Sequence, residues 1–134
     1  MTVEDISHLE LSYAPPFGSA KDIVNLAGFA ATNQRDGLVT TVTKLPTDPK
    51  VQLIDVRGKP IADANPVPGA INIPMPMLRA NLDKLDKNRP VVTVCAMGKN
   101  SYFASRVLKQ NGFDVKSLDG GMKMVLNPRN PAKM

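Results

Sequence analysis

Apolar and polar positions along most of the chain form two alternating kinds of segment. Short runs rich in apolar or β-branched residues, typical of buried strands, lie at 51–56, 70–73, 91–94 and 113–118. Apolar residues recur at helical spacing in the segments 78–85, 101–111 and 122–126. Because strands that alternate with helices form parallel sheets, the pattern predicts an α/β fold: a small parallel β-sheet flanked by helices on both faces.

Proline and glycine signals set the ends of these elements. Pro74 is expected to end the strand over 70–73, and Gly112 to terminate the helix over 101–111. The segment from 60 to 69 is rich in Pro, Asp and Asn, which predicts mostly loop. The helix over 101–111 is expected to bury an inner face made of Phe103, Val107 and Leu108.

The first 36 residues differ from the rest of the chain in pattern and in charge. A helix is predicted over 21–32, with Ser19 as its N-cap, and the polar stretch 33–37 is typical of a linker. The apolar stripe of that helix would consist of Ile23, Leu26, Ala27 and Ala30. Residues 1–33 carry a net charge of −3, and residues 34–134 carry +8. We therefore expect an N-terminal extension and linker over 1–36, a domain over 37–127 and a tail over 128–134.

The composition excludes several classes of protein. At 134 residues the chain has about the length of one domain. Its single cysteine rules out an intramolecular disulfide and a cluster of zinc-binding cysteines, so we expect no metal site. No apolar run approaches the roughly 18 residues of a membrane span, and the acidic N-terminus has no secretory signal, so no membrane association and a cytoplasmic location are expected. The absence of Trp and of dense basic clusters argues against nucleic acid, whereas the overall charge of +5 favours small anions.

The single cysteine lies where chemistry is expected in such a sheet. Cys95 follows the predicted strand over 91–94, and ligands of open α/β sheets bind at the carboxyl ends of strands. The loop that follows, and the start of the next helix, consist of Ala96, Met97, Gly98, Lys99, Asn100 and Ser101. Their backbone N–H groups are expected to bind an anion, and Lys99 adds positive charge. The pKa of Cys95 should therefore fall below about 8.5, which makes the thiol more nucleophilic.

A second interpretation of Cys95 stands beside this one. A lone cysteine at the end of a strand is often a small buried hydrophobic residue without reactivity. Gly98 and Lys99 favour the reactive interpretation, because glycine permits a tight loop and a lysine is out of place in an apolar pocket.

Four segments together resemble one known family. They are Leu53–Arg57, Val67–Pro74, Cys95–Ser101 and Leu118–Met122. In this order and spacing they are similar to the motifs of a rhodanese-like (sulfurtransferase) domain over about residues 37–127. The resemblance implies that Cys95 carries sulfur as a persulfide, and that the segment 96–101 binds the anionic sulfur. It also makes Asp55 and Arg57 candidates for residues that support this region, although a structural ion pair or turn bond explains them too.

Further residues resemble one subgroup, the rhodanese domains fused behind flavoproteins of the coenzyme A-disulfide reductase and NADH:polysulfide reductase type. They are Leu78-Arg79, Ser101-Tyr102 and Asn111-Gly112-Phe113. Residues 8–33 are similar to the end of the dimerisation domain of such a flavoprotein. The chain has no G-x-G pair, so we expect no cofactor in this chain; FAD, NADH or coenzyme A would bind elsewhere in a longer enzyme.

The resemblance implies small anionic sulfur donors (polysulfide, persulfide or thiosulfate), thiol or cyanide acceptors, and a flavoprotein reductase domain as a partner. Many family members have arginine at the position of Asn100, which binds the donor; its absence here favours polysulfide over thiosulfate. Two alternatives remain. One is a non-catalytic docking or regulatory module. The other is a phosphatase of the Cys-x5-Arg kind, which Ser101 disfavours because it stands where the arginine is required.

Overall fold

The computed structural model describes residues 1–8, 23–127 and 129. The chain divides into two compact units, Met1–Leu38 and Val39–Met134, which are described separately. The predicted cap Ser19 and all of the predicted tail except Arg129 lie outside the described residues, as do the side chains of Ile23 and Leu26.

The first unit contains two packed helices, α1 (Val3–Ser7) and α2 (Ile23–Arg35). Thr2 and Asp5 form a capping box that starts α1, a helix the sequence analysis did not predict. The helices approach closely at Gly28, where a Cβ atom would lie 2.5 Å from the backbone nitrogen of Ser7. Ala27 and Ala30 are exposed, so their prediction as part of the apolar stripe is wrong.

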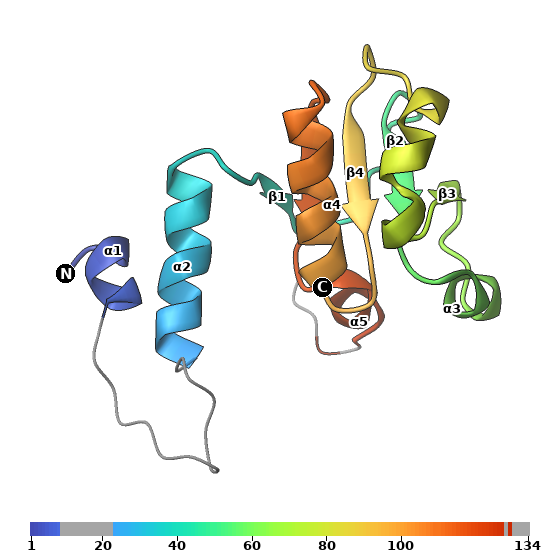
Figure 1. Ribbon diagram of the computed structural model, residues 1–134. Helices are drawn as coiled ribbons and strands as arrows, with labels where there is room; N and C mark the ends of the chain where they lie inside the picture. The colour runs from blue at the N-terminus through green and yellow to red at the C-terminus, as the bar shows by residue number, and fades with distance from the viewer. Residues whose placement is uncertain (9–22, 128, 130–134) are drawn as a thin grey trace. The chain divides into compact units, whose positions relative to one another are not determined.

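The second unit is built on a five-stranded parallel sheet (Figure 1). The strands are β1 (Thr41–Val42), β2 (Gln52–Asp55), β3 (Ala70–Asn72), β4 (Val91–Val94) and β5 (Val115–Leu118). Their order in the sheet is β1-β5-β4-β2-β3, and every neighbouring pair is parallel. The predicted fold class is confirmed, and β2 and β4 are buried along their whole length, as central strands of a covered parallel sheet require.

Helices cover the sheet. They are α3 (Lys59–Ala64), the 3-10 helices η1 (Met75–Met77) and η2 (Arg79–Lys84), α4 (Lys99–Gln110) and α5 (Gly121–Leu126). Successive side chains of a strand point to opposite faces, and the core accordingly forms two clusters. One contains Ile54, Leu78 and Leu108. The other contains Leu53 and Met122.

Three expectations for these elements are wrong in detail. The segment 60–69 is loop only over 65–69, because α3 begins at Lys59 and continues to Ala64, with Pro60 in its first turn, where the fixed φ of proline suits a helix. The segment 78–85 forms 3-10 turns rather than an α-helix. Phe103 is 46% exposed, and Ser101 and Ala104 take the inner face of α4 with Val107 and Leu108. Gly112, with φ of +86°, does terminate α4, as expected.

Candidate active site

Cys95 lies directly after β4, at the carboxyl edge of the sheet, and is 4% exposed. After a short loop the chain continues as α4, which begins at Lys99. Gly98 makes this turn with φ of +100°, a conformation that side chains rarely adopt, so glycine is required there. The turn folds the loop back over the sulfur atom and brings the free N–H groups of the first turn of α4 toward it.

Backbone amides surround the sulfur of Cys95. The amide of Gly98 donates a hydrogen bond to Sγ over 3.0 Å. Burial raises the pKa of the thiol, but hydrogen bonds from the Ser101 hydroxyl and from the amides of Ser101, Gly98 and Met97 lower the pKa by more. The resulting pKa lies below the usual value, as the sequence analysis expected.

A network of buried hydroxyl groups holds Ser101 in place behind the sulfur. Cys95 Sγ lies 3.5 Å from Ser101 Oγ, which lies 3.0 Å from the carbonyl oxygen of Gly98, so the single hydroxyl hydrogen of Ser101 points to the carbonyl beside a thiol and can turn to the sulfur of a thiolate. Ser117 Oγ in turn donates to Ser101 Oγ over 3.1 Å, and Thr93 Oγ1 donates to the Ser101 carbonyl over 2.8 Å. Thr93 and Ser117 were not predicted as site residues from the sequence. Their signal was a polar residue within each of two apolar strands, at positions that pair across β4 and β5.

The start of α5 closes against the backbone of the loop. The amide of Met122 donates to the Cys95 carbonyl over 2.8 Å, and the amide of Lys123 donates to the Ala96 carbonyl over 2.9 Å. A Cβ atom at Gly121 would lie 2.6 Å from the Cys95 carbonyl oxygen and 2.7 Å from the Gly98 nitrogen. The lack of a side chain at Gly121 therefore allows α5 to fix the shape of the loop.

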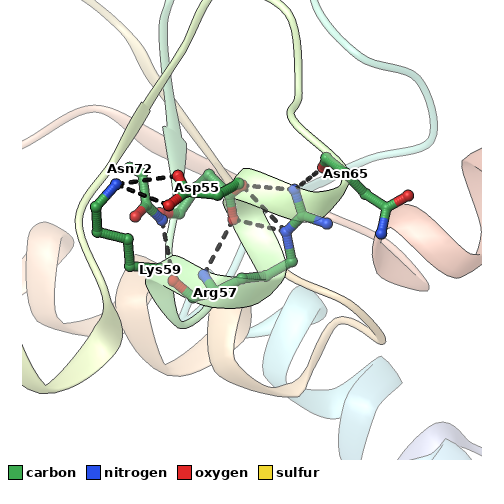
Figure 2. A network of polar contacts seen from close by, with 6 residues as sticks. Asp55, Arg57, Lys59, Asn65 and Asn72 are labelled. Carbon is green, nitrogen blue, oxygen red and sulfur yellow. Dashed lines mark hydrogen bonds and ion pairs between the residues drawn. The ribbon is translucent and has the colours of Figure 1, made fainter.

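A buried ion pair, Asp55 and Arg57, lies at the end of β2, next to β4 in the sheet (Figure 2). Arg57 Nε lies 3.0 Å from both carboxylate oxygens of Asp55, and Nη2 lies 2.7 Å from Oδ2 and from the carbonyl of Asn65. The Asn72 side chain donates to the carbonyls of Asp55 and Arg57 over 3.0 and 2.9 Å. The pair is thus held by Asn72 of β3 and by Asn65, which directly follows α3.

Arg57 also interacts electrostatically with Cys95. Its hydrogen bond to Asp55 is the main cause that raises the pKa of its guanidinium, burial opposes this, and the charges of Asp55 and Cys95 add to the increase. A fixed cation near Sγ favours the thiolate. The groups that lower the pKa of Cys95 are Ser101, Gly98 and Met97, so support of the sulfur site by Arg57 stays a prediction.

The remaining predicted site residues lie at the outer side of the loop. The side chains of Ala96, Met97, Lys99 and Asn100 are exposed. Within the described part of the chain, the side chains of Lys99 and Asn100 form no hydrogen bond or ion pair with the residues around Cys95. Their side chains therefore do not hold the loop, and their role in binding an anion stays a prediction.

Two further properties of the described residues bear on the chemistry. Across residues 1–8, 23–127 and 129, no three His, Cys, Asp or Glu side chains are grouped so that they could hold a metal ion. None of the described helices combines the length and apolarity needed to cross a membrane. The arrangement around Cys95 is that of a thiol whose pKa is lowered by hydrogen bonds to its sulfur.

Known proteins are similar to this chain in sequence and in fold. Residues 38–127 match the family model of the rhodanese-like domain. Thiosulfate sulfurtransferase GlpE of Shewanella oneidensis is 38% identical over 72 residues, which cover 53% of this chain and 71% of that protein.

Two solved structures match almost the whole chain. Reduced Bacillus anthracis CoADR-RHD is 42% identical with a TM-score of 0.84, and the match covers 92% of this chain and 23% of that one. An NAD-dependent persulfide reductase from A. fulgidus is 37% identical with a TM-score of 0.79, with coverage of 91% and 22%. The chain thus spans less than a quarter of either solved chain. Since the family model matches more than half of its residues, the chain belongs to the rhodanese-like domain family.

Proposed function

We propose that this protein is a sulfurtransferase or sulfur carrier that accepts a sulfane sulfur on Cys95 as a persulfide. The Cys95 thiolate attacks the outer sulfur of a donor R–S–S–H. A bond forms between Sγ and that sulfur, the donor S–S bond breaks, and R–S⁻ leaves with its electron pair. A thiol or cyanide acceptor then removes the outer sulfur and regenerates the thiolate.

The observation that carries this proposal is the ring of backbone amides on the sulfur of Cys95. These donors come from Met97, Gly98 and Ser101, and they stabilise negative charge at Sγ. Fixed N–H groups that face a developing anion stabilise the transition state of group transfer, as an oxyanion hole does. The lowered pKa of the thiol adds support, because the thiolate is the attacking form.

Mass spectrometry of the intact protein tests the proposal. After incubation with polysulfide and removal of the excess, we expect a gain of about 32 Da, one sulfur atom, that cyanide removes as thiocyanate. Cys95→Ser should show no gain, while its thermal unfolding stays close to that of the native protein, because the exchange is nearly isosteric. Native protein that takes up no sulfur would contradict the proposal and would favour a docking or regulatory module.

We also propose that a reductase domain, in the same or a separate chain, is the partner of this domain. The support is that both reductase-related structures match more than nine tenths of the chain, and so include most of its N-terminal 37 residues as well as the family domain. In this arrangement FAD and NADH bind to the reductase. A fluorescence titration of the isolated protein with FAD and with NADH should show no saturable change. Tight binding of either cofactor would contradict the proposal that both bind to the reductase.

A further inference from the structure

A groove lies on the second unit between α4 and the segment that follows β3. Its volume is about 510 Å³, within the usual range for small-molecule sites. Its lining residues are Met75, Arg79, Tyr102, Phe103, Arg106, Val107 and Gln110. None of them contributes to the amide ring around Cys95 or to the ion pair of Asp55.

The lining of the groove combines positive charge with apolar surface. Arg79 and Arg106 are its charged residues, and no acidic side chain lines it. In the described part of the chain neither arginine forms an ion pair with a carboxylate. The apolar part includes Met75 and the ring of Phe103, which is 46% exposed and lies edge-on to the Tyr102 ring at 5.5 Å. An organic anion with an apolar body matches this surface, because guanidinium groups bind carboxylate or phosphate while the rings cover carbon chains.

Along the chain, the groove begins directly after the residues that contact the sulfur. Tyr102 follows Ser101, whose hydroxyl contacts Cys95 Sγ. Met75 packs against the core cluster that includes Cys95, and its amide donates to the Val56 carbonyl over 3.2 Å, at the carboxyl edge of the sheet. From this edge α4 runs away along the groove. At about 1.5 Å per residue, the position of Arg106 lies roughly 7.5 Å along the axis from that of Ser101.

We propose that this groove binds the acceptor of the sulfur atom, and that the acceptor is a thiol whose anionic group, held by Arg79 and Arg106, lies several bonds from its sulfur. This proposal rests on the proposed function. The acceptor R–S⁻ attacks the outer sulfur of Cys95–S–S–H. The new bond joins R–S to that sulfur, the bond to Sγ breaks, Cys95 keeps the electron pair as the thiolate, and the product is R–S–S–H.

Acceptors that differ only in charge test the groove. A six-carbon ω-mercapto acid and the matching ω-mercapto alcohol are compared as acceptors of sulfur from the loaded protein. We expect the acid to react with the higher kcat/KM, and the double variant Arg79→Gln/Arg106→Gln to lose roughly tenfold with the acid. Transfer to the alcohol and to cyanide should be unchanged. Lys116→Gln removes an exposed charge outside the groove and should leave all three acceptors unaffected.

A binding experiment separates this proposal from the proposed function. The unreactive S-methyl ether of the mercapto acid is titrated into the native protein and followed by amide chemical shifts. Saturable shifts over 102–110 that the arginine variant loses are expected, and they would support the groove even if Cys95 takes up no sulfur. The proposal would be overturned if the mercapto acid and the mercapto alcohol gave the same kcat/KM in both the native protein and the arginine variant. It would also be overturned if the S-methyl ether caused no chemical-shift changes in α4.

Discussion

The reactivity of Cys95 depends on a competition between burial and hydrogen bonding at a single atom. A thiol that is 4% exposed among apolar neighbours is ordinarily inert, because burial disfavours its anion. Here the donors on the sulfur outweigh burial, and the pKa falls below its usual value. The thiolate fraction at neutral pH therefore depends on these hydrogen-bond donors. The Ser101 hydroxyl lowers the pKa of Cys95 more than any other donor does.

Ser101→Ala should raise the pKa of Cys95 and slow sulfur uptake at neutral pH. Burial raises the pKa of Cys95, and without the hydroxyl fewer hydrogen bonds oppose this effect. The rise of kcat/KM with pH should therefore move to higher pH. At high pH, where the thiolate is fully formed, the rate should recover most of its native value. The measurement is the pH profile of sulfur uptake or of thiol alkylation.

Ser105→Ala is the matched control for this variant. Ser105 is also buried on α4, but its hydroxyl donates to the carbonyl of Tyr102 and does not touch Cys95. Its pH profile should equal that of the native protein. If both variants shift the profile alike, the effect comes from α4 packing and not from the hydroxyl on the sulfur.

Asn100 should determine which sulfur donor the protein prefers and should not change the reactivity of the thiol. Its side chain is exposed beside the loop and offers only a neutral amide, whereas thiosulfate carries two negative charges. Asn100→Arg should raise kcat/KM for thiosulfate by about an order of magnitude and change polysulfide use much less, because charge-assisted hydrogen bonds to the oxygens are worth roughly 1.5–3 kcal/mol. The native protein should prefer polysulfide.

Asn88→Arg adds the same charge at an exposed residue of the loop before β4 and provides the control. It should change neither donor by more than about twofold, since a charge in solvent is screened within about 10 Å. Equal gains for both donors in Asn100→Arg would show that the position contributes only general electrostatic attraction.

At the scale of elements, the central strands and the loop after β4 were predictable because their signals are local. A short apolar run marks β2, a β-branched run marks β4, and glycine marks the turns, whatever the rest of the chain does. β1 has only two residues and depends on its pairing with β5, so no local sequence pattern predicts it.

The faces of α4 required tertiary information. Helical spacing alone allowed Phe103 on the inner face, but the inward positions belong to Ser101 and Ser105, whose hydroxyl groups are satisfied by backbone carbonyls and neighbouring hydroxyls. For the same reason Ser117 was not recognised: its role depends on the register of β5 against β4. The position of the sulfur was thus predictable from sequence, whereas the network behind it was not.

The contact between α5 and the loop should control the geometry of the sulfur site. In Gly121→Ala the new methyl group meets the Cys95 carbonyl and the amides of Met97 and Gly98, so these amides must move from the sulfur. We expect a loss of roughly 2–4 kcal/mol in unfolding free energy, a higher pKa of Cys95 and slower sulfur uptake at neutral pH. Denaturant unfolding and the pH profile of uptake measure these effects.

The variant Gly112→Ala distinguishes the effect of backbone strain from the effect of the steric clash at Gly121. Gly112 also has a positive φ, +86° against +64° at Gly121, but a Cβ atom there meets no other atom within 4 Å. It should lose about 1–2 kcal/mol from strain alone and keep the native pH profile. A Gly121→Ala protein with the same behaviour as Gly112→Ala would show that α5 does not position the loop.

At the scale of the whole molecule, charge and packing divide the chain at nearly the same place. Residues 1–33 carry −3, and residues 34–134 carry +8. The compact units divide after Leu38, and each has its own packed elements: α1 against α2 in the first, and helices against the sheet in the second. The amide ring, the ion pair of Asp55 and the groove on α4 all lie within the second unit.

Removal of residues 1–36 should therefore leave a folded, active sulfur-transfer domain. Cys95 and every group that contacts its sulfur are retained, so kcat/KM at physiological salt should stay within about twofold of the native value, and thermal unfolding should remain one cooperative transition. Because the removed part is acidic, anionic donors should react somewhat faster with the shortened chain at low salt, and this gain should vanish as salt screens the charge. Loss of the cooperative transition would show that the first unit contributes to the core of the second.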